Sequence, residues 1–154
     1  MRTFGIFILA VIMAISANQS GAAEKTSFDK MTDWFISLAP KIQEALDDDF
    51  TSACANLDRA ECSAGLTRNQ PKLQQAIAFI STHPAPACMQ ATVSELKRSL
   101  TLANDAYSLI QRSIDSQNGN LTLAASTLMR DSASAMESAA KVLEMSDAVK
   151  CSNE

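Results

Sequence analysis

The sequence lacks the residues on which most catalytic and nucleic-acid-binding sites depend. It contains one histidine and four glycines in 154 residues, and it has neither a G-x-S-x-G nucleophile elbow nor a glycine-rich phosphate loop. Its 13 Lys and Arg residues are outnumbered by 17 Asp and Glu residues and form no cluster, whereas phosphate binding requires concentrated positive charge. The sequence therefore gives no support for an enzyme, and nucleic acid is a poor candidate partner.

Stretches of alternating polar and apolar residues rich in β-branched types are also missing, so no strand is predicted. Alanine, leucine, serine, glutamine and lysine dominate instead, and this composition favours helices. We expect an all-α protein, an antiparallel helical bundle of about four helices in which the last two form a long hairpin.

Long apolar runs are confined to the N-terminus. Arg2 precedes an apolar run over residues 4–15, and small and polar residues follow it. This order is typical of a secretory signal peptide, and the run is too short to span a bilayer comfortably. We expect cleavage before Glu24, with residues 1–23 as the signal peptide and residues 24–154 as a single domain. That domain is predicted to be secreted or periplasmic, with no membrane span.

Four cysteines, Cys54, Cys62, Cys88 and Cys151, all follow this leader. An even number in a small exported chain is typical of two disulfides. Structural zinc sites, the competing interpretation, usually bring their ligands in close pairs, and here 7, 25 and 62 residues separate the cysteines. With no free thiolate, no second histidine and no haem-attachment motif, we expect no metal and no cofactor.

The first helix is predicted to begin at Thr26 or Ser27, where Asp29 completes a weak capping signal. Its apolar residues recur at alternating spacings of three and four, as on one face of a helix. Pro40 interrupts the pattern, so the helix either kinks or restarts there. Trp34 is expected beside the apolar stripe, where it covers the edge.

A second, shorter helix is predicted with Asn69 as its cap and Pro71 in its first turn. It should end before the "HPAPA" segment at residues 83–87, because two prolines forbid its continuation. His83, the single histidine, is expected on the surface of this connector.

The second half of the chain carries the clearest helical signal. A heptad stripe begins at Val93 in a helix expected over residues 88–116, "SQNGN" makes a tight turn, and a last helix is expected over residues 121–150. The last helix carries its stripe as far as Val149, and its many alanines and serines suit close antiparallel packing on the helix before it. Such a stripe does not say whether its partner belongs to the same chain, so a homo-dimer stays open.

Helix lengths predict how the cysteines pair. The last two helices have matching lengths, so a hairpin brings Cys88 and Cys151 to the same end of the bundle. An up-down-up-down order sends Cys54 and Cys62 to the opposite end. Positions eight apart in a continuous helix are about 12 Å apart, beyond the reach of a disulfide, so the chain must turn between Cys54 and Cys62. The predicted disulfides are Cys54–Cys62 and Cys88–Cys151.

Asp47, Asp48 and Asp49 stand directly before the first two cysteines in "DDDFTSACANLDRAEC". A calcium loop of the helix-loop-helix kind needs a central glycine and a glutamate at its twelfth position, and the segment supplies them in neither register. We interpret it as a bend held by the disulfide, in which Asp49 caps a short helical turn that holds Cys54.

Two functions of different classes fit these features. The first is an interaction protein that binds another protein, as inhibitors, immunity proteins and effectors do. Complementarity with a basic partner would use the acidic residues of this region. The predicted contact residues are Asp47, Asp48, Asp49, Asp58 and Glu61.

The second function is a carrier that holds an apolar small molecule between its helices, in an internal cavity that a solid bundle would not contain. Met129, Met136 and Met145 form a seam whose plainer interpretation is core filling, and the small residues of the last helix favour a solid core. We therefore expect a protein partner first and an apolar ligand second. The predicted ligand-lining residues are Trp34, Phe35, Tyr107, Met129 and Met136.

Asn120 begins an N-L-T sequon at the predicted tip of the hairpin. In a eukaryotic secreted protein this exposed site could carry a glycan, whereas in a bacterial protein the triplet has no such meaning. The leader, with its single Arg2, is compatible with both sources.

Overall fold

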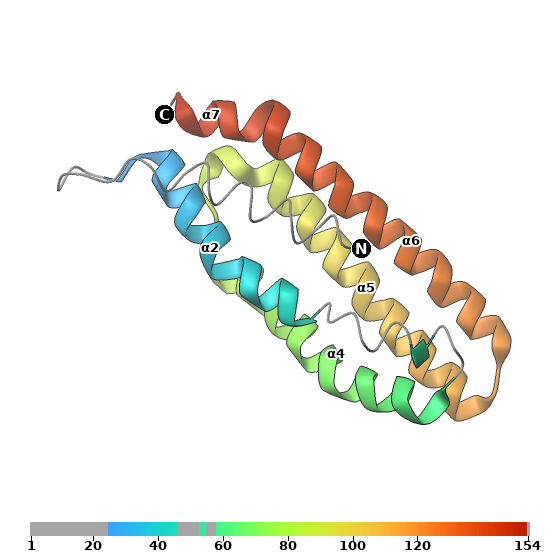
Figure 1. Ribbon diagram of the computed structural model, residues 1–154. Helices are drawn as coiled ribbons and strands as arrows, with labels where there is room; N and C mark the ends of the chain where they lie inside the picture. The colour runs from blue at the N-terminus through green and yellow to red at the C-terminus, as the bar shows by residue number, and fades with distance from the viewer. Residues whose placement is uncertain (1–24, 46–52, 55–57, 154) are drawn as a thin grey trace.

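The computed structural model describes residues 25–45, 53–54 and 58–153, and in these residues the chain is helical without any strand (Figure 1). This confirms the expected all-α bundle. None of the described helices is long and apolar enough to cross a membrane. The predicted signal peptide lies outside the described residues. The elements are α2 (Ser27–Ala45), α4 (Arg59–Thr82), η1 (Ala87–Met89), α5 (Gln90–Ser116), α6 (Gly119–Val142), η2 (Leu143–Asp147) and α7 (Ala148–Ser152).

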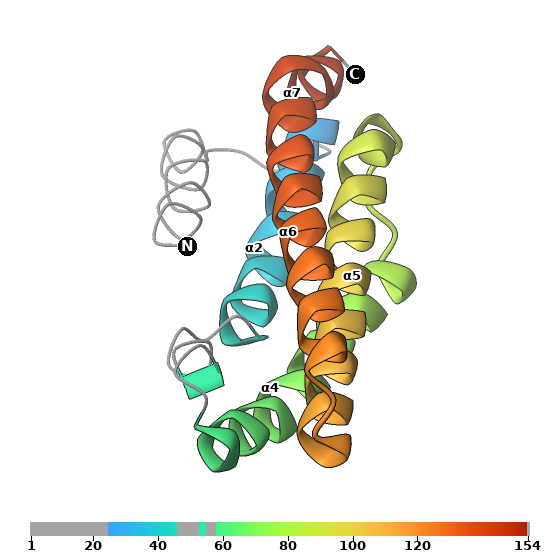
Figure 2. The same ribbon diagram turned by 90° about the vertical axis from the view of Figure 1, so that its right-hand side faces the viewer.

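The helices pack largely in chain order. The α5–α6 pair forms the long antiparallel hairpin and the most extensive helix contact, α4 packs on α5, and α2 packs on α4 (Figures 1 and 2). At one end of the bundle α7 also contacts α2 and η1. The hairpin thus supports α4, and α4 in turn supports α2.

The predicted cap of the first helix is confirmed as a reciprocal pair. The Asp29 main-chain N–H donates to Thr26 Oγ1 at 3.2 Å, and the Thr26 N–H donates to Asp29 Oδ2 at 3.1 Å. The Thr26 hydroxyl also donates to this carboxylate, and these hydrogen bonds lower the pKa of Asp29. Pro40 does not restart the helix, because α2 continues through it to Ala45.

Trp34 departs from its predicted place at the edge of the stripe. Its side chain is buried, and its Nε1–H donates to the His83 carbonyl oxygen at 2.8 Å. That carbonyl lies at the end of α4, so a polar partner far away in the sequence lets the indole enter the core. His83 itself is exposed as predicted, and its ring stacks on Phe79 with 4.2 Å between the centroids.

The predicted start of the second helix is wrong. The helix begins at Arg59, because the Asp58 side chain accepts the Glu61 main-chain N–H at 3.1 Å and caps it. Asn69 is buried in the middle of α4 instead of capping it. Pro71 lies on the exposed side of the helix, where its ring costs one main-chain hydrogen bond without ending the helix.

The tight turn of the hairpin is confirmed. Gln117 adopts the left-handed conformation with φ 55° and ends α5, and Asn118 then caps α6 by accepting the Asn120 N–H at 3.1 Å. Ser113 and Thr122 are joined by a hydrogen bond of 2.7 Å between their hydroxyl groups. These contacts reverse the chain within a few residues.

The last helix widens near its end, which the sequence pattern did not predict. The segment η2 is a π-helical turn, and such a turn contains an extra residue that rotates the following side chains about the axis. Val149, predicted on the core stripe, is therefore 54% exposed. The residues buried in its place are Leu143, Asp147 and Cys151.

Asp147 is fully buried and caps α5 from another helix. Its Oδ2 accepts the Thr92 main-chain N–H at 2.9 Å and the Thr92 hydroxyl at 2.7 Å, while Lys150 Nζ lies 3.4 Å from its Oδ1. The N-cap position of α5 is Met89, which offers no side-chain acceptor. The carboxylate therefore satisfies free N-terminal groups of α5 that no local residue reaches.

Both predicted disulfides are confirmed. The Cα atoms of Cys54 and Cys62 are 4.7 Å apart, and those of Cys88 and Cys151 are 5.3 Å apart, within the range that a disulfide allows. The first pair lies at the start of α4 and the second joins η1 to α7. These two ends of the bundle are opposite one another (Figure 1).

We expect the two disulfides to contribute unequally to stability. Removing the pair with Cys88→Ser/Cys151→Ser should lower the free energy of unfolding by about 4 kcal/mol, against about 2.5 kcal/mol for Cys54→Ser/Cys62→Ser, since the longer loop restricts the unfolded chain more. Urea unfolding followed by the fluorescence of Trp34, the single tryptophan, measures both. Equal losses would contradict the loop-length argument.

Removing the buried carboxylate at the start of α5 should also be costly. Asp147→Ala leaves the Thr92 N–H and hydroxyl without their acceptor, so we expect a loss of about 2–3 kcal/mol, with a smaller loss for Asp147→Asn. Asp105→Ala, at an exposed position of α5, is the matched control and should change the unfolding free energy by less than about 0.5 kcal/mol. A loss for Asp147→Ala no larger than that of the control would refute the capping role.

The buried hydroxyl of Tyr107 should make the free energy of unfolding fall at alkaline pH. Burial raises its pKa from 10.0 to about 12. Because the folded-state pKa lies above the unfolded one, this contribution, on the order of 2 kcal/mol, is complete below pH 10 and is lost as the pH rises towards 12. The ultraviolet absorbance of tyrosinate reports on this residue alone, since it is the single tyrosine. Ionisation near pH 10 with the fold intact would contradict the prediction, and Tyr107→Phe should reduce the pH dependence in this window.

Candidate functional site

Two of the predicted acidic contact residues lie at the start of α4. Asp58 and Glu61 are both exposed, and the hydrogen bond from the Glu61 N–H to Asp58 Oδ1 fixes the capping side chain. The remaining three, Asp47, Asp48 and Asp49, lie outside the described residues, as does the predicted cap formed by Asp49. The helical turn predicted at Cys54 is present over residues 53–54.

A further acidic residue, Asp115, lies at the same end of the bundle and was not among those predicted. Its carboxylate accepts a hydrogen bond of 2.8 Å from Gln111 Nε2, and Gln111 Oε1 accepts one of 3.2 Å from the Ser63 hydroxyl. This chain of contacts joins the last turns of α5 to the first turns of α4. The pairing of the two helices therefore brings Asp115 to the same end as Asp58 and Glu61.

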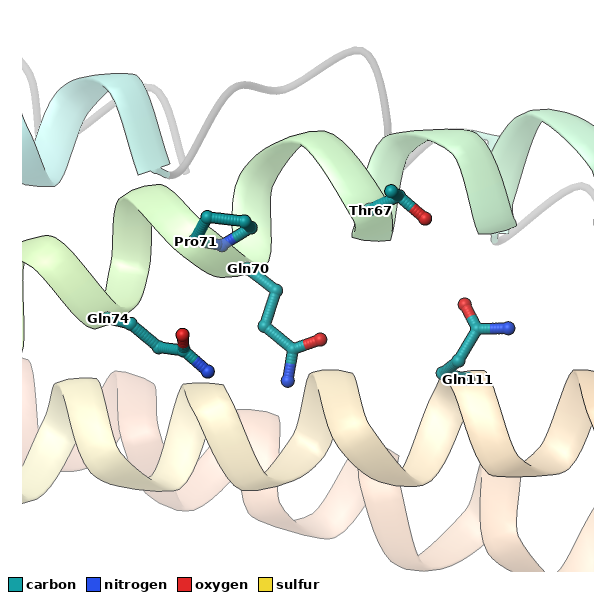
Figure 3. A pocket seen from close by; sticks show the side chains of 5 residues that line it. All are labelled: Thr67, Gln70, Pro71, Gln74 and Gln111. Atoms are coloured by element: carbon teal, nitrogen blue, oxygen red, sulfur yellow. The ribbon is translucent and has the colours of Figure 1, made fainter.

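An open groove of about 270 Å³ lies between α4 and α5 (Figure 3). Gln70 and Gln74 point from α4 towards α5, and Gln111 points from α5 towards α4 (Figure 3). Gln70 Nε2 donates to the Ser108 hydroxyl at 2.9 Å, so this amide is held in place across the interface. Its lining residues are Thr67, Gln70, Pro71, Gln74 and Gln111.

The proline in α4 removes one main-chain donor beside this groove. Pro71 has no N–H, so the Thr67 carbonyl lacks the donor that a helix normally supplies from four residues ahead. Both residues line the groove. The site thus offers amide donors and amide oxygens, which are suited to polar, hydrogen-bonding groups.

The five residues predicted to line an apolar ligand site belong to the packed interior. Trp34, Tyr107 and Met136 are buried in the core, and Phe35 and Met129 pack against it. The Tyr107 hydroxyl donates to the Ala45 carbonyl at 3.4 Å. None of the five lines the groove between α4 and α5.

The three methionines of the predicted seam differ in their burial. Met129 and Met136 take part in packing, as the core-filling interpretation expects, whereas Met145 is 80% exposed. The π-helical turn carries Met145 to the outer face, so it does not continue the buried seam.

Within the described ranges, no group of three or more His, Cys, Asp and Glu side chains is placed to hold a metal ion. All four cysteines are bonded in pairs. The His83 Nδ1 atom lies 2.9 Å from the Thr82 hydroxyl and 3.3 Å from the Phe79 carbonyl, so the ring is engaged at the end of its own helix.

Asn120 lies exposed in the first turn of α6, at the tip of the hairpin where the sequence placed it. The hydroxyl of Thr122, the third residue of the sequon, is hydrogen-bonded to Ser113. The asparagine side chain is therefore accessible, while the threonine that the sequon requires is engaged by the turn.

Comparisons with protein-family models, with curated proteins and with solved structures find no match to this chain.

Proposed function

We propose that this is a secreted or periplasmic, non-enzymatic protein that binds another protein at the end of the bundle formed by the start of α4 and the end of α5. The observation that carries the proposal is the open, amide-lined groove between these helices, close to three exposed carboxylates. The two disulfides support export, because such bonds form and persist in oxidising compartments.

The groove and the acidic end are complementary to a protein chain in two ways. Gln70, Gln74 and Gln111 present amide groups that can both donate to and accept from the main chain of a partner segment. The carboxylates of Asp58, Glu61 and Asp115 attract Lys or Arg side chains, and rim charges of this kind steer association and select the partner.

An apolar carrier function receives less support. Sites for apolar small molecules are enclosed and lined mainly by hydrophobic and aromatic side chains, whereas this groove is open, and four of its five lining residues carry a side-chain amide or hydroxyl group. The aromatic and methionine side chains proposed for that role are used in packing. The protein-binding function is therefore the one that the described surface favours.

Neutralising the acidic end should weaken partner capture without disturbing the fold. The variant Asp58→Asn/Glu61→Gln/Asp115→Asn removes three charges and keeps side-chain shape, and Asn retains the capping ability of position 58. We expect the tagged variant to retain about one tenth or less of the partner that the parent protein captures by cross-linking in its host. Quantitative mass spectrometry measures the captured partner, and added salt should weaken capture by the parent protein.

The matched control is Asp105→Asn/Glu144→Gln, which removes charge at exposed positions away from the groove and should capture the partner as the parent does. Equal capture by the acidic-end variant and the control would refute the proposed surface. A small molecule retained in stoichiometric amount in the native mass spectrum, without any captured protein, would favour the carrier instead.

A further inference from the structure

Three of the four large apolar side chains that are exposed in the described residues lie on the segment formed by α6, η2 and α7. Leu123 in α6 is 70% exposed, Met145 in η2 is 80% exposed and Val149 in α7 is 54% exposed. Single exposed apolar side chains are common on protein surfaces, so the meaning of these three depends on the residues that lie between them. Only one other large apolar residue of the described chain, Ile36 on α2, is comparably exposed.

Leu123 begins an exposed face that runs along α6 towards Met145. At 3.6 residues per turn, positions 123, 127, 130, 134, 137 and 141 face the same direction, and the side chains at all six are exposed. The opposite face carries Ala125, Ser132 and Ala139, which are buried. Figure 2 shows α6 in front of the other labelled helices, so none of them covers its outer side.

The outer face is arranged symmetrically about Ser134. Leu123 lies eleven residues before Ser134 and Met145 lies eleven residues after it, while Arg130 and Glu137 lie one turn to either side. The centre of the face is small and polar, and the distance at which helices pack depends on the size of such side chains. A face of this kind is complementary to itself when it is turned end for end.

The two central charges are not used within the described part of the chain, whose ion pairs are Lys25–Asp33, Glu95–Arg98 and Asp147–Lys150. Arg130 and Glu137 lie about two turns apart on the same edge of the face, and both are exposed. In an antiparallel pair of helices related by a two-fold axis, a residue of one copy meets a residue on the same edge of the other copy. The two residues lie at equal distances along the sequence on opposite sides of the axis. Arg130 of one copy would therefore meet Glu137 of the other, twice.

We propose that a second copy of this chain packs antiparallel on the outer face of α6, with a two-fold axis near Ser134. Leu123 then packs on the partner's Met145, and Arg130 pairs with the partner's Glu137. Such an interface is isologous, since both copies use the same patch. Charge complementarity favours a second copy over an unrelated partner. When the helix is reversed end for end, Arg130 takes the place of Glu137, so each charge faces its opposite.

Charge reversal with rescue tests this arrangement. The protein, purified after any processing of residues 1–23, is studied by sedimentation equilibrium from about 1 to 100 µM, the range of weak association. Arg130→Glu and Glu137→Arg should each raise the dimer Kd by about tenfold or more, because each creates two repulsive pairs. The double variant Arg130→Glu/Glu137→Arg restores both pairs and should return the Kd to within about threefold of the parent value.

Arg112→Glu, at an exposed position of α5, is the matched control and should leave the Kd unchanged. The fluorescence of Trp34 checks that every variant is folded. A parent protein that is monomeric across the whole range would overturn the proposal, as would a dimer that is insensitive to either single reversal. Single reversals that weaken the dimer without rescue by the double variant would overturn the antiparallel register. None of these outcomes depends on the partner proposed for the acidic end.

Discussion

The buried carboxylate of Asp147 sets the geometry on which the rest of the bundle depends. It caps α5 through two hydrogen bonds from Thr92, and it can do so only because the π-helical turn rotates it inward. The Cys88–Cys151 disulfide fixes the same end covalently. Together they hold the end of the α6–α7 segment against the start of α5. The first two helices pack on this assembly, α4 on α5 and α2 on α4 and α7.

The sequence predicted what periodicity and local chemistry encode. Matched helix lengths were enough to pair Cys88 with Cys151, and the Thr26–Asp29 cap was visible as a spacing of three residues. Pro71 is typical of a helix beginning and so predicts a start near Asn69, whereas α4 begins at Arg59 behind the cap formed by Asp58. The spacing of Asp58 and Glu61 is that of a cap, and it indicates the correct start of the helix.

Other features depend on contacts between helices, which a local pattern cannot contain. The π-helical turn has no periodic signal of its own, because it is stabilised by Asp147 reaching Thr92 across 55 residues of sequence. The groove needs the axial register of α4 against α5, which the Gln70–Ser108 contact reports. From the sequence, Gln70 and Gln74 are visible only as amides on one face of a helix. Asp115 gains its place beside α4 in the same way, through Gln111 and Ser63.

The two proposed surfaces have a joint geometric consequence. The acidic end lies beside the hairpin tip, near Leu123, whereas Met145 lies near the Cys88–Cys151 end. An antiparallel pairing through α6 therefore places the acidic ends of the two copies at opposite ends of the dimer, more than about 35 Å apart along the helix axis. A partner with two basic segments spaced to match would bind both ends with a gain from effective concentration. A partner with one such segment would bind each end independently, so the ratio of partner to dimer follows from the spacing of basic residues in the partner.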